Sequence, residues 1–508
     1  MTTLFTGARI HGTTATALAV EHGVITWLGD AAHAPPAPAR FELGGAHVAP
    51  AFVDAHVHAT SAGLLRTGLD LTKAESREEV LDAVRDRAGT DEVLWGHGWD
   101  ETNWPGNRPP TRTELDAAAG STPVYLSRID VHSALASTAL LARVPEARTA
   151  AGWSADGPLT RDAHHHVRNA FGDSVAPDQR RAAQLEFLHH AASRGIACVH
   201  ECGGPDISGA RDFRDLLALE GKLPRVVGYW GAAGDAPAGA RGKAGDFFVD
   251  GAFGSRTAAL AAPYADAPHT SGSRYLDAGR IAAHLVACTE QGMQAGFHVI
   301  GDAAAAEVVA GFQRAEKVVG EHALGAARHR LEHLEMVTAE QAAELARLGV
   351  VASVQPLFDA TWGGPDGMYA QRLGVERAKG LNPFALLAAA GVTLAFGSDA
   401  PVTPVDPWAT VRAAVNHRTP GSGLTREAAF EAHTAGGWAA AGERGGVLEV
   451  GAPATFAVWR DETCLRTVLD GRMIYQRSES EGAGAVWTEE RAQARGTSAE
   501  HATREDGV

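Results

Sequence analysis

The feature that most constrains the fold is a regular alternation of short apolar runs with alanine-rich helical segments. Eight runs have the length and composition of buried strands, at residues 51–58, 195–201, 225–230, 247–253, 294–300, 330–335, 350–355 and 393–398. Helical patterns lie between them, for example at 180–194, 278–291, 303–319 and 338–348. Eight strands alternating with helices predict an α/β fold, a (β/α)8 TIM-like barrel with a parallel sheet.

Both ends of the chain carry strands of a different kind. Short alternating strands occupy the first 30 residues, and similar ones occur at 457–459 and 468–475. We therefore predict a small β-sandwich domain built from residues 1–50 and 440–477, enclosing a barrel domain at 51–439. The stretch from about 60 to 190 is too long for a simple loop and predicts an inserted layer over the barrel mouth. The polar tail at 478–508 is expected to be disordered.

Charge and composition narrow the range of partners. The net charge is −16, and phosphate binding needs a basic surface, so the sequence argues against a nucleic-acid partner. No segment approaches the ~20 apolar residues that cross a bilayer, and no secretory signal is evident. The four cysteines are too few and too scattered for a disulfide scaffold. We expect a cytoplasmic protein with no membrane partner.

The strongest local motif is a pair of histidines at the end of the first apolar run. His56 and His58 are two residues apart, so on a strand they share a face, with Cα atoms ~6.6 Å apart. Two imidazoles placed in this way can bind one metal ion. Asp54 lies on the same face and is a candidate to orient an imidazole.

Three later strand ends carry compatible groups. His298 and His333 lie in short apolar runs, and Asp399 ends the last one. Each alone could be a structural histidine or an ordinary turn. Together with His56 and His58 they all fall at the carboxyl ends of barrel-like strands, where barrel enzymes build their active sites. The set predicts a metal centre at the barrel mouth.

Several further stretches carry a family resemblance. They are residues 98–101, 111–116, 250–260 and 446–451. With the order His-x-His, His, His, Asp on successive strand ends, the chain resembles the amidohydrolase superfamily. It looks most like the branch of N-substituted formamide deformylase and related metal-dependent hydrolases, amidohydrolase family 3. The likeness runs from about residue 1 to 476 and says little about the substrate.

The resemblance implies a hydrolase for a non-peptide C–N bond in a small molecule, such as an amide, a formamide or a cyclic amide. It implies that His56, His58, His298 and Asp399 bind a divalent metal ion, Zn2+ or another. His333 would be a further ligand or would polarise the substrate carbonyl, and Asp399 would also be the general base. This is sensible chemistry, because the ion acidifies water and a carboxylate beside it can accept the proton. A homodimer is the assembly that the resemblance suggests.

One position departs from the family pattern. Many binuclear members carry a lysine, carboxylated to bridge two metal ions, four residues before an Asp-Gly pair like the one at 250–251. This chain has Asp246 there, and Lys243 is out of register. Ligand count therefore favours one metal ion over two. The alternative is that Asp246 or another acid replaces the lysine.

The inserted layer offers candidates for the substrate pocket. His97, Trp99 and His132 lie in the region that closes over the substrate in the family. Arg256, after the Asp-Gly pair, could contact the substrate as well. The histidine triple at 164–166 is predicted to lie on a solvated surface.

Two alternative functions stay open at this point. One is deamination of a heterocycle on the same fold, which a mononuclear site also suits. The other is a catalytically inactive metal-binding barrel, which the missing lysine supports. The presence of Asp399 argues against the inactive barrel, because a purely structural metal site needs no base.

Overall fold

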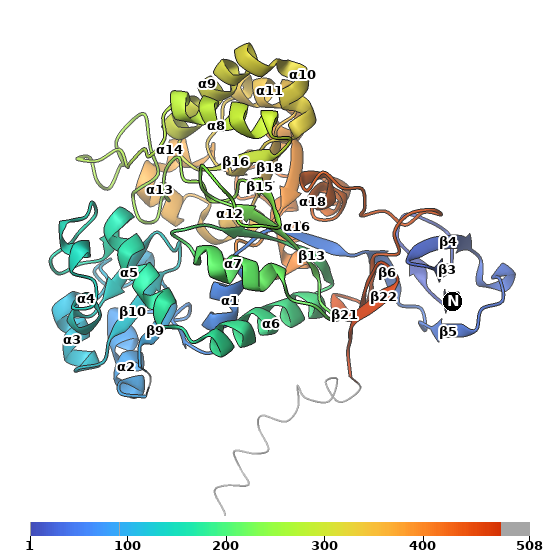
Figure 1. Cartoon of the computed structure of the whole chain (residues 1–508), viewed down its shortest axis with the longest axis horizontal. Coiled ribbons are helices and arrows are strands. Elements are labelled where there is room, and N and C mark those ends of the chain that lie inside the picture. Colours follow the sequence, from blue (N-terminus) through green and yellow to red (C-terminus); the bar gives the residue numbers. More distant parts are fainter. Residues whose placement is uncertain (1, 91, 479–508) are drawn as a thin grey trace, which may run out of the picture.

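A computed structural model of the chain describes residues 2–90 and 92–478. Apart from Ser478, the tail that was predicted to be disordered lies outside the described residues. The centre of the molecule is an eight-stranded parallel sheet with helices around it (Figure 1). Its strands, in spatial order, are β7 (Phe52–Val57), β13 (Ile196–Gly203), β14 (Arg225–Trp230), β15 (Ala240–Lys243), β16 (Gln294–Val299), β17 (Arg330–His333), β18 (Val351–Val354) and β19 (Thr393–Phe396).

Backbone contacts between the first and last strands close the sheet into a barrel. Val57 pairs with Ala400 in parallel fashion. The amide of Asp399 donates to His56 O at 2.8 Å, and the amide of His58 donates to Ala400 O at 2.9 Å. The predicted (β/α)8 barrel is confirmed.

The fourth barrel strand differs from the sequence prediction. It is β15, whereas the predicted run at 247–253 makes only an isolated bridge, between Phe248 and His298. The chain turns sharply at Gly245, which has a φ of +80°, so the ladder ends before the apolar run begins. This turn places Asp246 after the fourth strand, at the carboxyl end of the barrel.

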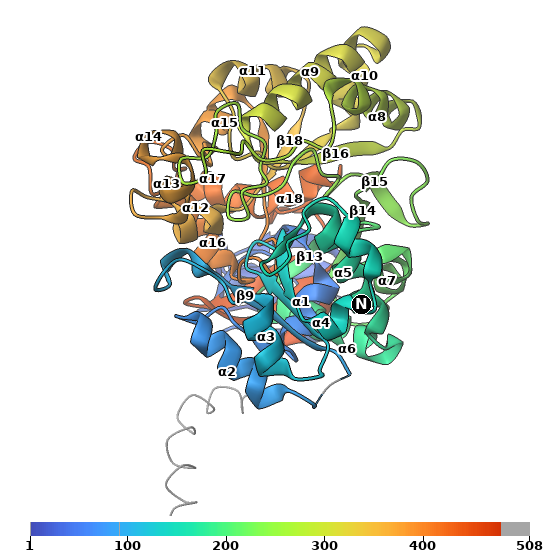
Figure 2. The ribbon, with the colours of Figure 1, turned by 90° about the vertical axis from the view of Figure 1, so that its left-hand side faces the viewer.

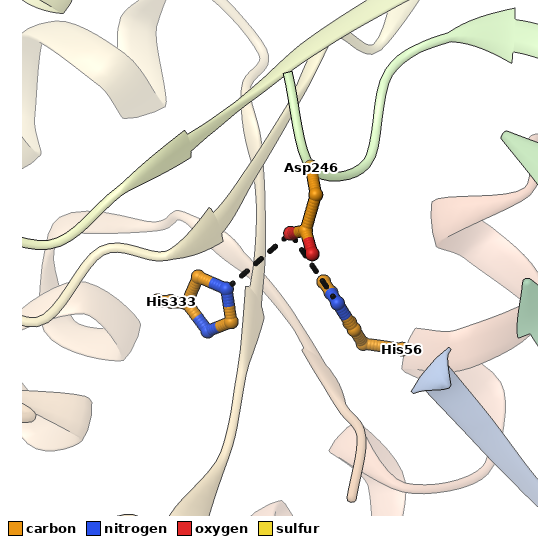
Figure 3. A group of neighbouring side chains, drawn as sticks. All are labelled: His56, Asp246 and His333. Atoms are coloured by element: carbon orange, nitrogen blue, oxygen red, sulfur yellow. Dashed lines mark ion pairs between the residues drawn. The ribbon is translucent and has the colours of Figure 1, made fainter. Parts of the chain in front are cut away.

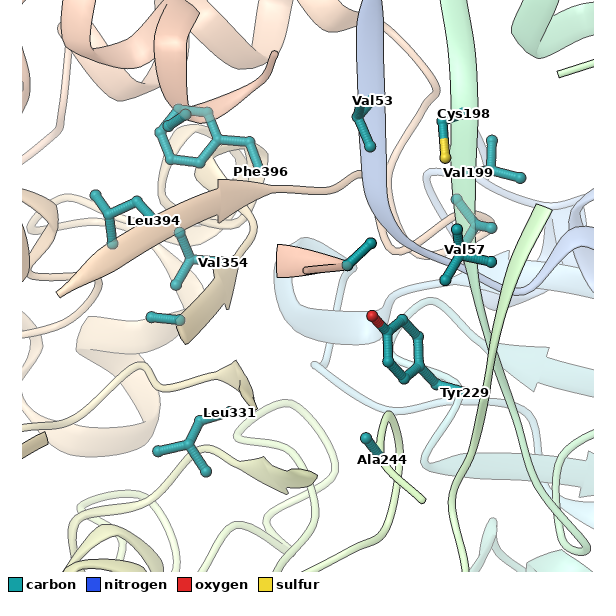
Figure 4. Packing of buried hydrophobic residues seen from close by; sticks show 14 of the residues in the cluster. Val53, Val57, Cys198, Val199, Tyr229, Ala244, Leu331, Val354, Leu394 and Phe396 are labelled. Carbon is teal, nitrogen blue, oxygen red and sulfur yellow. The ribbon is translucent and has the colours of Figure 1, made fainter. Parts of the chain in front are cut away.

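Helices lie between and after the barrel strands in the chain. They are α1 (Ala59–Leu65), α6 (Pro177–Ser193), α7 (Gly209–Leu217), α8 (Ala278–Glu290), α9 (Asp302–Val319), α10 (Glu321–Ala327), α11 (Ala339–Arg347), α12 (Pro356–Trp362), α13 (Met368–Leu373), α14 (Val375–Ala378), α15 (Phe384–Ala390), α16 (Pro407–Val415), α17 (Arg426–Ala432) and α18 (Ala435–Ala440). Apolar side chains of strands and helices form one continuous core, part of which Figure 4 shows around Val53, Tyr229 and Leu331. Within residues 2–90 and 92–478, none of the helices combines the length and apolarity that crossing a bilayer requires.

A separate layer lies beside the barrel, between β7 and β13 in the chain (Figure 2). Its five-stranded sheet runs in the order β12 (Leu159–Thr160), β11 (Ser133–Ala136), β10 (Val124–Arg128), β9 (Leu94–Trp99) and β8 (Leu69–Asp70). The layer also contains α2 (Arg77–Arg87), α3 (Arg112–Ala119), α4 (Thr138–Leu141) and α5 (Arg161–Ser174). Two apolar clusters stabilise it, one with Trp95 and Tyr125, the other with Leu94 and Leu126. Adjacent strand residues thus face opposite sides of this sheet.

Strands from both ends of the chain form two small sheets away from the barrel mouth (Figure 1). One contains β4 (Val24–Gly29), β3 (Ala17–Glu21), β1 (Thr3–Thr6) and β5 (Ala39–Glu42). The other contains β2 (Arg9–Ile10), β6 (His47–Pro50), β20 (Phe456–Arg460), β21 (Thr463–Leu469) and β22 (Arg472–Gln476). Their facing sides share one apolar cluster that includes Phe5, Val48 and Phe456. Because β6 pairs with β20, the N-terminal and C-terminal segments are held in one sheet.

Candidate metal centre

Histidines and acids gather at the carboxyl ends of the barrel strands. They are His56 on β7, His58 directly after β7, Asp246 after β15, His298 on β16, His333 on β17 and Asp399 after β19. All of them are buried. Since the carboxyl ends of parallel barrel strands meet at one mouth, residues far apart in the chain converge there.

The imidazoles of His56 and His58 face two carboxylates. His58 Nε2 lies 3.2 Å from both Asp246 Oδ2 and Asp399 Oδ1. His56 Nε2 lies 3.5 Å from Asp246 Oδ1 and 3.4 Å from Asp399 Oδ1. From the opposite side, His333 Nε2 approaches Asp246 Oδ1 to 3.6 Å (Figure 3). The potential ligand atoms thus form three overlapping groups that share His56, each with all its atoms within 4.8 Å of one another. His56 is grouped with Asp246 and His333, with His58 and Asp399, and with Cys202 and Glu332.

The unpartnered atoms of this cluster fit a divalent cation. His56 Nε2, Asp246 Oδ1 and Asp399 Oδ1 are buried without a hydrogen bond. Burial by itself would raise the pKa of the two carboxyls, but the neighbouring imidazoles hold both pKa values below the ordinary range. Burial lowers the pKa of His58, and the carboxylates more than offset this and raise it to about 9. In the absence of a metal ion, the negative charges of Asp246 and Asp399 therefore favour protonation of the imidazoles that face them. A divalent cation bound between these groups would balance the same charges.

Hydrogen bonds on the far side of the rings orient His56 and His333. His56 Nδ1 lies 2.9 Å from Glu332 Oε2, and His333 Nδ1 lies 2.8 Å from Gln355 Oε1. An acceptor at Nδ1 places the ring proton there and leaves the lone pair of Nε2 facing the centre, as metal ligation requires. Arg330 fixes Glu332 in turn through two hydrogen bonds, of 2.6 and 2.9 Å.

Sequence reasoning missed Glu332 and Gln355 and assigned a different role to Asp54. Among the described residues Asp54 makes no hydrogen bond to an imidazole; its carboxylate accepts from the backbone amides of Ser398 at 2.8 Å and of His56 at 3.5 Å. The prediction that Asp54 orients a histidine was therefore wrong, because its side chain turns toward the backbone that leads into Asp399. A signal for Glu332 was present, since Arg330 and Glu332 alternate on an apolar strand and must share one face.

His298 lies next to these groups without belonging to any of them. Its ring centroid is 4.5 Å from that of His333, and its Nδ1 is buried without a hydrogen bond. Burial lowers its pKa to about 3, so the ring is neutral and able to donate a lone pair. Asp246, which the sequence suggested only as a substitute ligand, contacts both histidines of the first pair: its carboxylate oxygens lie 3.5 Å from His56 Nε2 and 3.2 Å from His58 Nε2.

Two cavities open on the centre. The first lies between the barrel mouth and the inserted layer, where His58 and Asp246 meet His97 and His132. The second lies on the other side, against His298, His333 and Asp399. His132 lines both cavities, so it stands at the boundary between them. Of the four predicted substrate-binding residues, the structure brings His97 and His132 to the first cavity.

Trp99 and Arg256 lie elsewhere. Trp99 is buried in the apolar cluster on the opposite side of the inserted sheet, where its Nε1 donates to Leu126 O at 3.1 Å. The backbone at Gly98 has a φ of +105°, and the pairing with β10 shifts register beside it. This bulge turns Trp99 away from the side that carries Trp95 and His97. The guanidinium of Arg256 is paired with Asp266, with Nη2 2.7 Å from Oδ2.

The histidine triple at 164–166 also differs from its predicted solvated position. His164 is fully buried, and its Nε2 lies 3.0 Å from the hydroxyl of Tyr125. The ring of His165 stacks on Phe248 with centroids 5.9 Å apart, and only His166 is exposed. Successive helical residues point about 100° apart, so three in a row on α5 cannot all face solvent when the helix packs on a sheet.

The closed barrel, with a histidine and carboxylate centre at its mouth, defines a metal-dependent hydrolase. The chain belongs to the amidohydrolase family, whose model matches residues 41–475. It is 28% identical over 442 residues to the putative amidohydrolase YtcJ of Bacillus subtilis, covering 78% of this chain and 80% of that protein. It is 27% identical to the protein LONG AFTER FAR-RED 3 of Arabidopsis thaliana, covering 74% and 70% of the two chains.

A solved structure has the same fold. An uncharacterized metal-dependent hydrolase from Pyrococcus furiosus superposes with a TM-score of 0.70 at 25% identity. The match covers 91% of this chain and 100% of that one. The inserted layer and the small sheets thus belong to an arrangement that the Pyrococcus protein shares over nearly the whole length of both chains.

Proposed function

We propose that this protein hydrolyses a non-peptide C–N bond, in an amide, a formamide or a cyclic amide, at a centre that holds one Zn2+ ion. The observation that carries the proposal is the convergence of unpartnered atoms from His56, Asp246 and Asp399 beside a cavity. A divalent ion at such a site acidifies water and polarises a carbonyl oxygen. The likeness to a putative amidohydrolase supports the choice of bond.

The ligands of this ion would be His56, His58, Asp246 and Asp399. Asp246 and Asp399 both approach His56 at Nε2, whose single lone pair can bind only one ion. This sharing supports one ion over two. Neutral His333 presents the lone pair of its Nε2, which suits a further ligand, while its protonated form would donate a hydrogen bond to the substrate carbonyl.

Asp399 is the residue we assign to proton transfer. Its Oδ1 is buried, has no hydrogen bond and lies at the centre of the cluster. A carboxylate placed in this way accepts a proton from the attacking water and delivers it to the departing nitrogen. The inserted layer bounds the first cavity, which also reaches the metal centre, and this favours a small substrate over an extended peptide.

Metal content and hydrolysis test this function together. Elemental analysis of the purified protein should find about one zinc per chain, and the double variant His56→Ala/His58→Ala should lose it. The zinc-loaded enzyme should release amines from a panel of formamides, linear amides and cyclic amides. Absence of any metal after zinc-supplemented expression would overturn the proposal. Two ions per chain would correct the ion count, and ammonia released only from aminated heterocycles would replace amide hydrolysis with deamination.

A further inference from the structure

Arg168 is a charged residue of the first cavity that neither the fold nor the metal centre uses. It lies on α5 of the inserted layer, and the cavity that it lines also reaches His58 and Asp246. A single ligand in this cavity can therefore touch both the metal centre and the guanidinium.

The guanidinium of Arg168 has no hydrogen-bond or ion-pair partner among residues 2–90 and 92–478. Its Nε is buried without a hydrogen bond, and in the described part of the chain no carboxylate lies within 4.0 Å of it. Arg180, on the same cavity wall, is instead paired with Asp212 at 3.4 Å and donates to Gly172 O at 3.1 Å. Buried Arg128 in the inserted layer contacts three acids. Arg168 is partly buried and has no acid partner among the described residues, whereas Arg180 and Arg128 are paired, so the contrast points to an anion from outside the chain.

The histidines around Arg168 do not compensate its charge. Burial, with a contribution from Arg168, lowers the pKa of His132 and of His165 to about 3, and it lowers that of His164 as well. All three rings are therefore neutral at pH 7 and neither neutralise the guanidinium nor compete with it for an anion.

Part of the cavity wall is apolar. Trp95, Phe171, Val175 and Phe248 line the cavity together with Arg168, His58 and Asp246. The rings of Trp95 and Phe171 lie 5.8 Å apart, centroid to centroid. Such a wall favours the hydrocarbon or aromatic part of a ligand and offers it few hydrogen bonds.

Arg168 also lines a neighbouring surface groove. The groove shares Arg180 and Val175 with the cavity and adds Arg211 and Asp173. Arg180 is paired with Asp212 and Arg211 with Asp215, so among the described residues Arg168 is the arginine of this groove without an acid partner.

We propose that the substrate is an amide with a carboxylate at one end, which Arg168 binds while the scissile bond lies at the metal centre. This inference rests on the proposed function and names the substrate class of the same site. An apolar or aromatic segment separates the two ends, as in an N-acyl amino acid. The planar guanidinium binds a carboxylate through two parallel hydrogen bonds, which sets the orientation of the substrate as well as its affinity.

The test uses N-benzoyl ω-amino acids with one to six methylene groups, each compared with its neutral primary amide. The zinc-loaded wild type should prefer the carboxylate of the best-fitting length over its neutral partner by ~10-fold or more in kcat/KM. Arg168→Gln should lower kcat/KM for that carboxylate by roughly 10–100-fold, mainly through KM, and change the neutral compound less than ~3-fold. Arg181→Gln is the matched control, since it removes an exposed arginine from the nearby helix α6, and it should behave as wild type.

The possible results separate this inference from the proposed function. If amides are cleaved without preference for the carboxylate, or if Arg168→Gln affects both compounds equally, the substrate class is wrong and the hydrolase proposal stands. If no amide is cleaved, calorimetric titration of Asp399→Asn and Asp399→Asn/Arg168→Gln with the carboxylates decides the matter. Tighter binding by the protein that retains Arg168 supports the inference, and equal binding overturns it. Circular dichroism and a melting curve verify that each variant is folded.

Discussion

The metal centre and the wall that faces it are built in opposite ways. At the barrel mouth, His56 and His333 each have a hydrogen-bond partner on the far side of the ring, and Asp399 is fixed through its own amide. On the wall, the guanidinium of Arg168 has no partner in the described residues. The first region is fixed by the chain itself, whereas the second is incomplete until a ligand arrives.

This difference assigns chemistry and recognition to different parts of the sequence. The reactive groups come from strand ends of the barrel, where the position of each residue follows from the sheet. The first cavity takes much of its wall from the inserted layer, which has apolar clusters of its own. Changes in that layer can alter which molecules fit without displacing the metal ligands.

The largest effect should follow from Asp399→Asn, which removes a reactive carboxylate from the metal centre at the barrel mouth. Loss of the proton acceptor should lower kcat by about 10³-fold, within the range for general bases, because an amide does not accept the proton. The melting temperature should change little, since the backbone bonds of the residue persist. Steady-state kinetics and a melting curve check both. Residual activity above a tenth of wild type would remove Asp399 from its assigned role.

Glu332→Gln should weaken metal binding although Glu332 is not one of the proposed ligands. The carboxylate keeps the proton of His56 at Nδ1, and loss of such partners typically costs 10–100-fold in metal affinity. Competition with a coloured chelator measures the change. Glu335→Gln is the matched control, because this nearby buried glutamate bonds Tyr369 and Asn382 rather than an imidazole. Equal losses in both variants would mean that Glu332 acts only through general stability.

Metal removal should make stability depend on pH in a defined direction. In the metal-free protein the pKa of His58 is raised from 6.5 to about 9. A raised pKa means that the folded state binds the proton more tightly, so this stabilisation is complete below pH 6.5 and is lost as the pH rises through 9. The melting temperature of the metal-free protein should therefore fall relative to the zinc-loaded protein across this window. A constant difference between the two forms would contradict the assignment.

The smallest effect should come from Arg256→Ala, which tests whether Arg256 contributes to the part of the first cavity that binds the substrate. Arg256 is engaged with Asp266 and lines neither cavity. A partly exposed ion pair contributes little to stability. We expect kcat/KM to change less than ~2-fold for every substrate of the benzoyl series. A selective loss for the carboxylates would extend the wall to Arg256.

The sequence predicted the barrel because buried parallel strands are continuous apolar runs. It also placed five residues at the ends of such runs, where the structure gathers them: His56, His58, His298, His333 and Asp399. The fourth strand was not predicted, because Ala240–Lys243 contains two charged residues and a glycine and lacks an apolar run. It is a strand because it pairs with β14 and β16 on its two sides. Trp99 was wrongly predicted to line the substrate pocket. A bulge at Gly98 reverses the alternation of side chains between the two faces of the strand, and the sequence alone did not reveal this bulge. Arg168 could not be found at all, because an absent ion pair is a property of three-dimensional surroundings.

The seam of the barrel has a consequence for how the protein is made. The backbone bonds that join β7 to the chain after β19 involve His56, His58 and Asp399 themselves, and Asp54 holds Ser398 across 344 positions of sequence. A nascent chain cannot close this loop until the ribosome has released residues near 400, and joining such distant segments is a slow event. Metal uptake should therefore be a late step of biosynthesis. A chain truncated before Asp399 would lack both the closed barrel and one of the two carboxylates of its centre.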